Sequence, residues 1–398
     1  MPPSAPLSAA LGRRQFLALA SGLAAAGVLR LRAAAAQPEP PSGSPRGPII
    51  INALGGIEDP NVPEPAPDPT RPVGAVRAAS LDERALSDAL ASGLTAINLT
   101  LGYVAGPMEP FEYTVREIAV WDRLVRENSS RLLKVYTVAE ILRAHAEQRI
   151  GLIYGFQNAA QVGTDPTRVD VFADLGVRVI QLTYNPRNQL GDGSAVAENR
   201  GITPFAREVI ARLNARRVML DLSHSGENTC LEATRASTQP VSINHTGCRA
   251  LNDLPRNKTD AELRLVAERG GFVGIYFMPF LHPSGQAHAA DVVRHIEHAV
   301  DVCGEDHVGI GTDGSVTTVD DLDRFREHTA QEVAARKQGG IGAAGERADT
   351  LPFVVDLRGV EQFHKLASLL AARGFTPARV EKILGGNFLR FAGDVWGG

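Results

Sequence analysis

Short apolar runs alternate with amphipathic segments along the chain from residue 48 onward. Each run is closed by polar residues and is too short for a buried helix, so the pattern predicts buried parallel strands. We place eight strands, at residues 49–54, 94–101, 151–156, 177–183, 218–222, 241–244, 272–276 and 308–311.

The segments between these runs show helical spacing, which is the alternation expected of a parallel sheet covered by helices. Helices are predicted at residues 81–91, 113–126, 138–147, 169–175, 204–215, 225–238, 260–269 and 291–303, and further ones at 320–336, 359–373 and 377–384. This order predicts one TIM-like (β/α)8 barrel over residues 48–396. The glycine-rich residues 339–345 are expected to form a surface loop near its mouth.

Two histidines follow neighbouring strands of the predicted barrel, His224 after the fifth and His245 after the sixth. Adjacent parallel strands lie roughly 5 Å apart, so we expect the two imidazoles to emerge side by side at one rim, where barrel enzymes place their reactive groups. Imidazole nitrogens bind zinc and similar metals, which makes the pair half of a candidate metal site. The alternative is that each histidine hydrogen-bonds a loop backbone.

Other polar residues also follow the predicted strands: Asn52, Gln157, Tyr184, Asn185 and Asp313. Asp313 lies where a buried strand runs into a glycine turn, and it is a candidate general base or metal-site partner, unless it only closes an Asx-type turn. A serine-hydrolase triad of Asp221, Ser223 and His224 is disfavoured, because near neighbours on one strand do not converge.

Composition narrows the expected partners. The 398 residues carry a formal net charge of −4 without a long basic run, so we expect a small molecule or peptide as substrate and no nucleic acid. Cys230, Cys248 and Cys303 are odd in number and widely spaced, which predicts buried packing residues rather than disulfides or a thiolate zinc cluster.

Residues 1–36 have the pattern of a twin-arginine signal peptide. Arg13 and Arg14 precede an apolar stretch that is too short to span a bilayer comfortably, and small residues around Ala34 and Ala36 suit a signal peptidase. Residues 37–47 are rich in Pro, Gly and Ser and are expected to be a linker. We therefore predict an exported, periplasmic protein without a membrane span.

Several segments, mostly beyond residue 180, match one known family in order and spacing. They are Gln-Leu-Thr-Tyr-Asn at 181–185, Asp-Leu-Ser-His-Ser at 221–225, residues 240–245, Arg-Asn at 256–257 followed by Asp260, and residues 270–275, 295–314 and 385–390. Together they resemble the renal, or membrane, dipeptidase family of zinc peptidases. The resemblance implies a (β/α) barrel whose binuclear zinc site hydrolyses dipeptides.

The resemblance also implies roles for individual residues. It makes His224 and His245 metal ligands, Arg256 the clamp for the substrate carboxylate, and Asp313 the residue that handles protons. Tyr184 and Asn185 would contact the substrate. Because the family often forms dimers, a homodimer is expected.

The chain departs from the family at the other metal ligands. The family opens with Asp-x-His-x-Asp on its first strand, and Leu54 and Gly56 stand at the two ligand positions here. Gln157 replaces the bridging glutamate, and Tyr184 replaces a substrate-facing histidine. A neutral amide cannot bridge two cations as a carboxylate does. We therefore expect at most one zinc ion, on His224 and His245 with Gln157 or Asp313 and water, or no metal at all.

Three functions remain open on this basis. In the first, an exported dipeptidase-like metallohydrolase cleaves a dipeptide or small amide with metal-activated water while Asp313 moves the proton. In the second, a catalytically impaired family member binds a small ligand in the periplasm, since a fold does not guarantee its chemistry. In the third, the same site hydrolyses a lactone or a cyclic amide.

Overall fold

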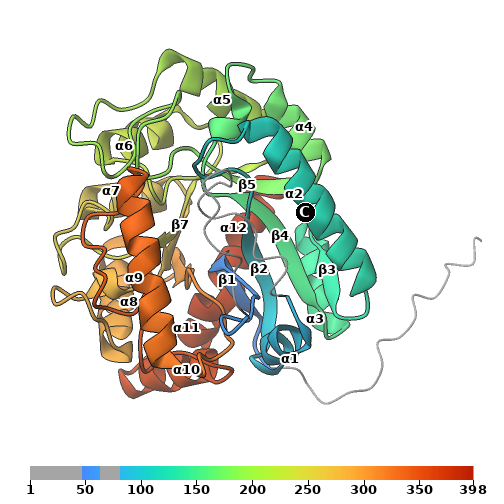
Figure 1. The fold of residues 1–398 in the computed structure, drawn as a ribbon, viewed down its shortest axis with the longest axis vertical. Coiled ribbons are helices and arrows are strands. Elements are labelled where there is room, and N and C mark those ends of the chain that lie inside the picture. The colour runs from blue at the N-terminus through green and yellow to red at the C-terminus, as the bar shows by residue number, and fades with distance from the viewer. Residues whose placement is uncertain (1–46, 63–80, 398) are drawn as a thin grey trace, which may run out of the picture. The chain divides into compact units, whose positions relative to one another are not determined.

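The computed structural model describes residues 47–62 and 81–397, so the predicted signal peptide and nearly all of the predicted linker lie outside it. One parallel sheet runs in the order β1-β2-β4-β5-β6-β7-β8-β9, and β3 pairs with β4 (Figure 1). The strands are β1 (Ile50–Gly55), β2 (Leu94–Leu101), β3 (Leu132–Lys134), β4 (Ile150–Phe156), β5 (Val177–Gln181), β6 (Met219–Asp221), β7 (Ser242–Thr246), β8 (Phe272–Ile275) and β9 (Val308–Ile310).

Eight of these strands are the predicted ones, and the short β3 is an addition that pairs with the start of β4. The sheet closes nearly into a barrel, because β1 and β9 are joined by single contacts rather than by a ladder. Asn52 accepts from the Thr312 backbone N–H at 2.8 Å and donates to the Thr312 hydroxyl at 2.8 Å. The Leu54 carbonyl also accepts from the backbone N–H of Asp313 at 2.9 Å. The predicted TIM-like (β/α)8 fold is confirmed.

The described residues form a set of α-helices, most of which surround the sheet and bury an apolar stripe against it. They are α1 (Glu83–Ala91), α2 (Pro110–Glu127), α3 (Val138–Ala146), α4 (Arg168–Asp174), α5 (Pro204–Ala215), α6 (Glu227–Ala236), α7 (Asp260–Glu268), α8 (Ala289–Cys303), α9 (Leu322–Gln338), α10 (Gln362–Ala372), α11 (Pro377–Glu381) and α12 (Asn387–Trp396). Local sequence sets several of their starts. Proline at the first helical turn opens α2, α5 and α11, and a Thr259–Glu262 capping box opens α7.

The helix α12 was not predicted, and it closes the amino-terminal end of the barrel. Its Phe388, Phe391 and Trp396 pack with barrel-lining residues such as Met219 and Phe272 in one buried cluster. A π-helical turn, Lys382–Gly386, leads into it. Because the apolar residues of α12 fill the barrel floor, the reactive end must be the opposite rim, where the strands end.

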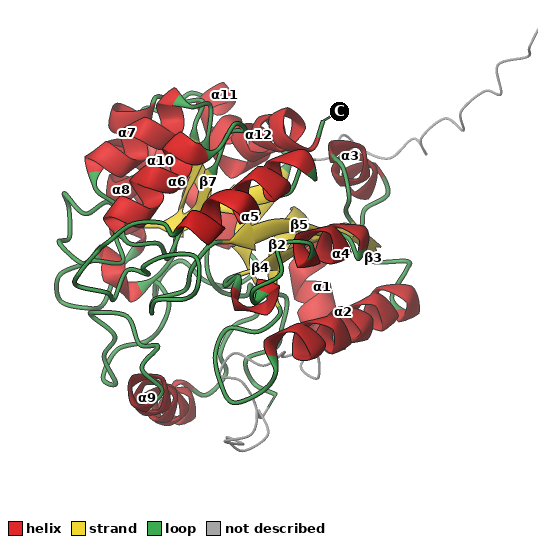
Figure 2. Ribbon diagram, turned by 90° about the horizontal axis from the view of Figure 1, so that it is seen from above, coloured by secondary structure: helices red, strands yellow, loops and turns green. Residues whose placement is uncertain are grey.

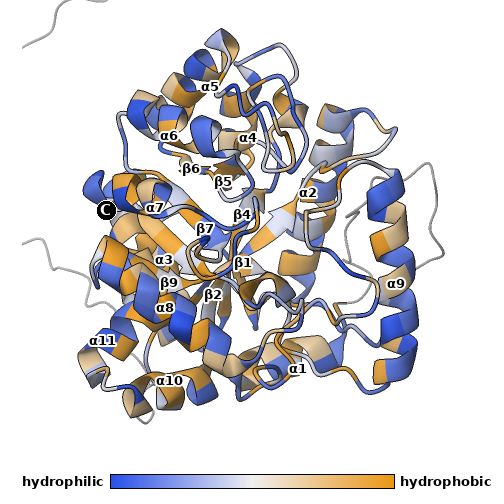
Figure 3. Cartoon of the chain, turned by 90° about the vertical axis from the view of Figure 1, so that its left-hand side faces the viewer, coloured by the Kyte–Doolittle hydropathy of each residue, from blue (hydrophilic) through white to orange (hydrophobic). Residues whose placement is uncertain are grey.

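The segment after β9 covers that rim. Helix α9 buries only Thr329 and lies apart from the helices on the sheet in Figures 2 and 3. Residues 339–346 then form neither helix nor strand, and Ile341 packs against Tyr184 and Val104. The predicted loop is confirmed, and it lies at the mouth of the barrel.

Two smaller predictions also have outcomes. Cys230, Cys248 and Cys303 are buried free thiols. No helix within the described ranges is both long and apolar enough to cross a bilayer.

Candidate active site

The two predicted histidines meet at the rim. His224 lies in the turn that follows β6, and His245 lies in β7, with their Nε2 atoms 3.0 Å apart. The ring centroids are 4.9 Å apart, and both side chains are buried. The expected convergence of the two imidazoles is therefore confirmed, and the hydrogen bond between them fixes their protonation.

The protonation states follow from Asn185. Its Oδ1 accepts from the Ser194 hydroxyl at 2.9 Å, while its Nδ2 donates to the Ile341 carbonyl at 3.0 Å. His224 Nδ1, 2.6 Å from that Oδ1, must then carry a proton, which leaves the lone pair of neutral His224 on Nε2. His245 donates its Nε2–H to this lone pair. Within residues 47–62 and 81–397, the buried Nδ1 of His245 has no hydrogen-bond partner.

The carboxylate of Asp221 fixes the chain around this pair. It accepts from the backbone N–H and hydroxyl of Ser223, at 3.0 and 2.5 Å, and from the Asn244 N–H at 3.0 Å. The Ser223 hydroxyl in turn accepts from the His245 N–H at 3.1 Å. Burial raises the pKa of Asp221, and these hydrogen bonds oppose that effect. Asp221 thus ties the ends of β6 and β7 together.

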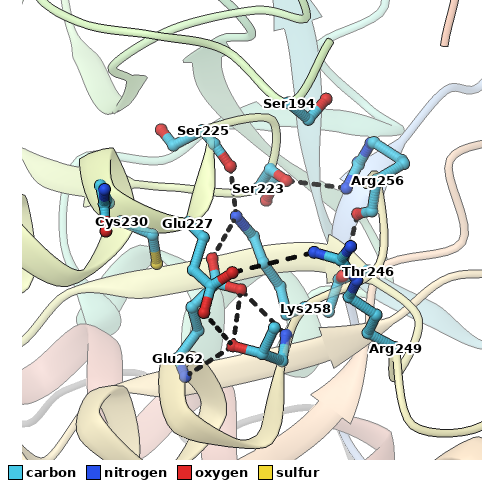
Figure 4. A network of polar contacts seen from close by, with 12 residues as sticks. Ser194, Ser223, Ser225, Glu227, Cys230, Thr246, Arg249, Arg256, Lys258 and Glu262 are labelled. Carbon is cyan, nitrogen blue, oxygen red and sulfur yellow. Dashed lines mark hydrogen bonds and ion pairs between the residues drawn. The ribbon is translucent and has the colours of Figure 1, made fainter. Parts of the chain in front are cut away.

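Two buried cations hold the loop between β7 and α7 against the same strand ends (Figure 4). Arg256 donates from Nη1 to the Ser223 carbonyl at 2.7 Å and from Nη2 to the His245 carbonyl at 2.9 Å, and it is only 2% exposed. Lys258 donates to the Ser225 carbonyl at 2.5 Å and pairs with Glu262 at 2.9 Å. The arginine that the resemblance assigns to the substrate is therefore engaged with backbone. Its role as a clamp stays a prediction.

Tyr184 covers His224. Its ring stacks on the imidazole with centroids 4.2 Å apart, and its hydroxyl accepts from Arg336 Nη2 at 3.0 Å. Arg336 comes from the last turn of α9 and pairs with Glu346 at 2.8 Å. Neither Arg336 nor Glu346 was predicted as a site residue, because the glycine-rich loop indicates a position near the mouth but not which charged side chains beside it meet Tyr184.

Asp313 follows β9 in a left-handed backbone conformation, with φ 57°. Burial raises its pKa to about 6, and the charges of Arg256 and Arg336 partly oppose this. Asp313 also lines a cavity of about 10 Å³ together with Phe277 and Arg358. That is roughly the room one water molecule needs, so the cavity as it stands does not admit a dipeptide.

The positions that depart from the family hold no metal-binding geometry. Gln157 donates from Nε2 to the Thr100 hydroxyl at 2.7 Å, and Leu54 is buried in the barrel wall. A Cβ atom on Gly56 would lie 1.8 Å from a carboxylate oxygen of Glu58, so Glu58 fills the space of the missing side chain. That carboxylate faces Asp313, whose pKa it raises.

The donor set does not fit the zinc implied by the resemblance. Among the described residues, no three His, Cys, Asp or Glu side chains group closely enough to hold an ion. Burial is the main reason that the pKa values of both histidines lie well below the usual range, and nearby positive charges lower them further. The charges of Arg256 and Lys258 act on His245, and those of Arg256, Lys258 and Arg336 act on His224. Zinc-binding histidines usually donate their second N–H to a partner, and His245 lacks one within the described chain.

Comparison with known proteins agrees with the barrel fold. The sequence model of the membrane dipeptidase family, peptidase family M19, matches residues 84–331. An uncharacterised protein from the pqqA 5′ region of Klebsiella pneumoniae is 25% identical over 301 residues, covering 73% of this chain and 98% of that protein. Dipeptidase tcpJ of Claviceps purpurea is 25% identical over 287 residues, covering 71% of this chain and 60% of its own length. A solved amidohydrolase from Pseudomonas aeruginosa is 31% identical with a TM-score of 0.72, covering 88% of this chain and 97% of that one.

Proposed function

Because this chain belongs to the membrane dipeptidase family, we propose that it binds a dipeptide-like small molecule at the barrel mouth without zinc-dependent hydrolysis. The family consists of hydrolytic dipeptidases, so membership alone supports a dipeptidase-like hydrolase. The observation that carries our proposal is the pair of neutral, hydrogen-bonded imidazoles flanked by cations, where the binuclear zinc centre implied by the resemblance would also have carboxylate ligands.

The charges around the pair suit a ligand with a carboxylate. Arg256, Lys258 and Arg336 all act on His224, and Lys258 and Arg336 are paired with Glu262 and Glu346. Planar guanidinium groups bind carboxylates with two parallel hydrogen bonds, and a dipeptide carries one carboxylate at its end. Retained cations and lost anionic ligands therefore favour recognition over metal catalysis.

Metal content and turnover test this proposal together. We expect protein folded with zinc or manganese to contain less than one ion per chain by elemental analysis. We also expect a dipeptide panel to be turned over no faster than by the His224→Ala/His245→Ala variant, while calorimetry detects binding of a dipeptide. One zinc per chain that is lost in the double variant, with dipeptide turnover, would reject the proposal.

A second function is favoured by Asp313. With a pKa of about 6 and a cavity of about one water beside it, its carboxylate suits a general base that takes a proton from water attacking a lactone or cyclic amide. This candidate predicts metal-independent turnover that rises through pH 6 and is lost in Asp313→Asn. The cysteines and the serine of the disfavoured triad play no part in it.

We further propose that the chain is exported by the twin-arginine route and forms a homodimer. The paired arginines support export, and the family resemblance supports the dimer. Replacing Arg13 and Arg14 with lysine should keep the protein in the cytoplasm with its amino-terminal segment uncleaved. Light scattering on the mature protein measures the oligomeric state.

A further inference from the structure

The arginine that the resemblance assigns to the substrate carboxylate is tied to backbone here. Arg256 spans the ends of β6 and β7 with both terminal nitrogens, and its guanidinium also lies 5.4 Å from the Tyr276 ring centroid. These bonds use two of its five N–H groups and keep two buried backbone carbonyls paired. Arg256 therefore acts on the wall of the site.

Arg336 is placed differently. It reaches the mouth from α9, its guanidinium carbon lies 5.8 Å from the Tyr184 ring centroid, and Tyr184 connects it to the His224 ring. Its side chain keeps 24% exposure, against 2% for Arg256. Among the cations that act on His224, Arg336 is thus the one that a ligand arriving from solvent meets directly.

A carboxylate of the chain already occupies this arginine. Arg336 Nε lies 3.1 and 3.2 Å from the two carboxylate oxygens of Glu346, and Nη2 lies 2.8 Å from one of them. This is the forked geometry in which arginine holds a free carboxylate. Glu346 is thus placed as a ligand carboxylate would be.

The segment that carries Glu346 is rich in glycine and borders a cavity. It follows four glycines between residues 339 and 345, and Gly340 and Gly345 adopt positive φ of 68° and 94°. A cavity of about 70 Å³ lies against Gly345 and Arg347. Asn185 of the strand ends also donates to the Ile341 carbonyl of this loop at 3.0 Å.

We infer that Arg336 is the carboxylate anchor of this site, and that Glu346 occupies it until the carboxylate of a ligand takes its place. The ligand class rests on the proposed function, whereas the anchor rests on the Arg336 contacts. Exchanging one carboxylate for another keeps the charge balance of the mouth, so opening does not leave a bare guanidinium. The site then selects ligands with a free carboxylate over the corresponding amides.

Acetate tests the anchor without knowledge of the ligand. Glu346→Gln keeps the side-chain shape but removes the charge, so we expect acetate to raise its Tm by roughly 1–3 °C over chloride at equal ionic strength. The Glu346→Gln/Arg336→Gln double variant should show no acetate response. Glu346→Gln/Arg326→Gln, which removes a solvent-exposed arginine of the same helix, should keep it. Equal responses in all three variants, or no response in any, would overturn the inference.

Calorimetry with glycyl-phenylalanine and its carboxyl-terminal amide separates the anchor from the ligand class. We expect Glu346→Gln to bind the dipeptide at least tenfold more tightly than the unmodified chain, and to bind the amide no better. If the dipeptide binds equally well with and without Arg336, the result supports the proposed function and rejects the anchor. An acetate response without any dipeptide binding supports the anchor and rejects the dipeptide-like ligand.

Discussion

The rim of this barrel has two unlike halves. The histidine half, with His224, His245 and Arg256, keeps the residues of the family and hydrogen-bonds them densely. In the β1/β4 half, the neutral residues Leu54, Gly56 and Gln157 stand where the resemblance implies metal ligands. Residues of the histidine half also hold strand ends together, so the fold itself needs them. Metal ligands of the other half can disappear without loosening the barrel.

The difference shows what a family resemblance transfers. The matching segments lie mostly in the histidine half and beyond, and they predict the fold because they build it. The zinc chemistry implied by the resemblance needs ligands from both halves, whereas the carboxylates beside the cations around His224 here are those of Glu262 and Glu346. Resemblance in the histidine half is therefore stronger evidence for the fold than for the chemistry.

Restoring the β1/β4 half should give the largest effect. We expect Leu54→His/Gly56→Asp/Gln157→Glu to bind zinc several orders of magnitude more tightly than the unmodified chain, because a structural site of four ligands holds zinc by roughly 10–16 kcal/mol. Glu58 must swing away from residue 56, which its flexible side chain allows. Competition with a zinc chelator measures the affinity.

The control for this restoration is the same triple change in the His224→Ala/His245→Ala background, which should bind zinc weakly. If the unmodified chain binds zinc as tightly as the restored one, the two halves do not differ in the way we describe.

Breaking the buried ion pair of the histidine half should give the next largest effect. Lys258→Met leaves Glu262 charged and buried at 2% exposure, which should cost about 3–5 kcal/mol in the free energy of unfolding. Urea unfolding followed by circular dichroism measures it. Lys258→Met/Glu262→Met removes both charges and should recover part of the loss. A cost of Lys258→Met near zero would mean that this half is not held by the pair.

Much of this molecule could be predicted from its sequence, because the pattern and the geometry have the same cause. Buried parallel strands must be apolar on both faces, so all eight barrel strands stand out, and adjacent strand ends bring His224 and His245 together. The added strand β3 was missed because its third residue, Lys134, interrupts the apolar run. Helix α12 was missed because Gly385 and Gly386 follow the predicted helix at 377–384 and read as its end, whereas a π-helical turn carries the chain through them.

The site was predicted less completely, since long-range contacts leave no local signal. That Arg256 donates to two strand-end carbonyls depends on how a loop folds back. That Arg336 and Glu346 meet over Tyr184 depends on the path of the chain after β9. Their roles, like those of Gln157 and Asp313, stay predictions until measured.

The pH dependence of Asp313, at the border of the two halves, comes third. Its pKa is raised from 3.8 to about 6, so the folded chain binds more protons than the unfolded chain between these values, and stability falls as pH rises through them. The Asp313→Asn variant does not lose stability in this way, because asparagine does not ionise. Its gain over the unmodified chain should be absent near pH 4 and reach up to about 3 kcal/mol above pH 6.

Denaturant unfolding of both proteins from pH 4 to pH 8 measures this difference in the free energy of unfolding. Both proteins carry His224 and His245, so the titration of these histidines does not contribute to the difference. A constant difference across the range would show that Asp313 is ionised in the fold at all these pH values, as a metal centre would require.

The smallest expected effect compares one buried amide from each half. Gln157→Leu loses one hydrogen bond, to Thr100, and should cost about 1 kcal/mol. Asn185→Leu in the histidine half loses hydrogen bonds to His224, Ser194 and Ile341 and should cost about 2–3 kcal/mol, since it leaves buried groups unpaired. Urea unfolding at pH 7 measures both. Equal costs would mean that the β1/β4 half supports the barrel as strongly as the histidine half, and its lost ligands would then need an explanation other than structural freedom.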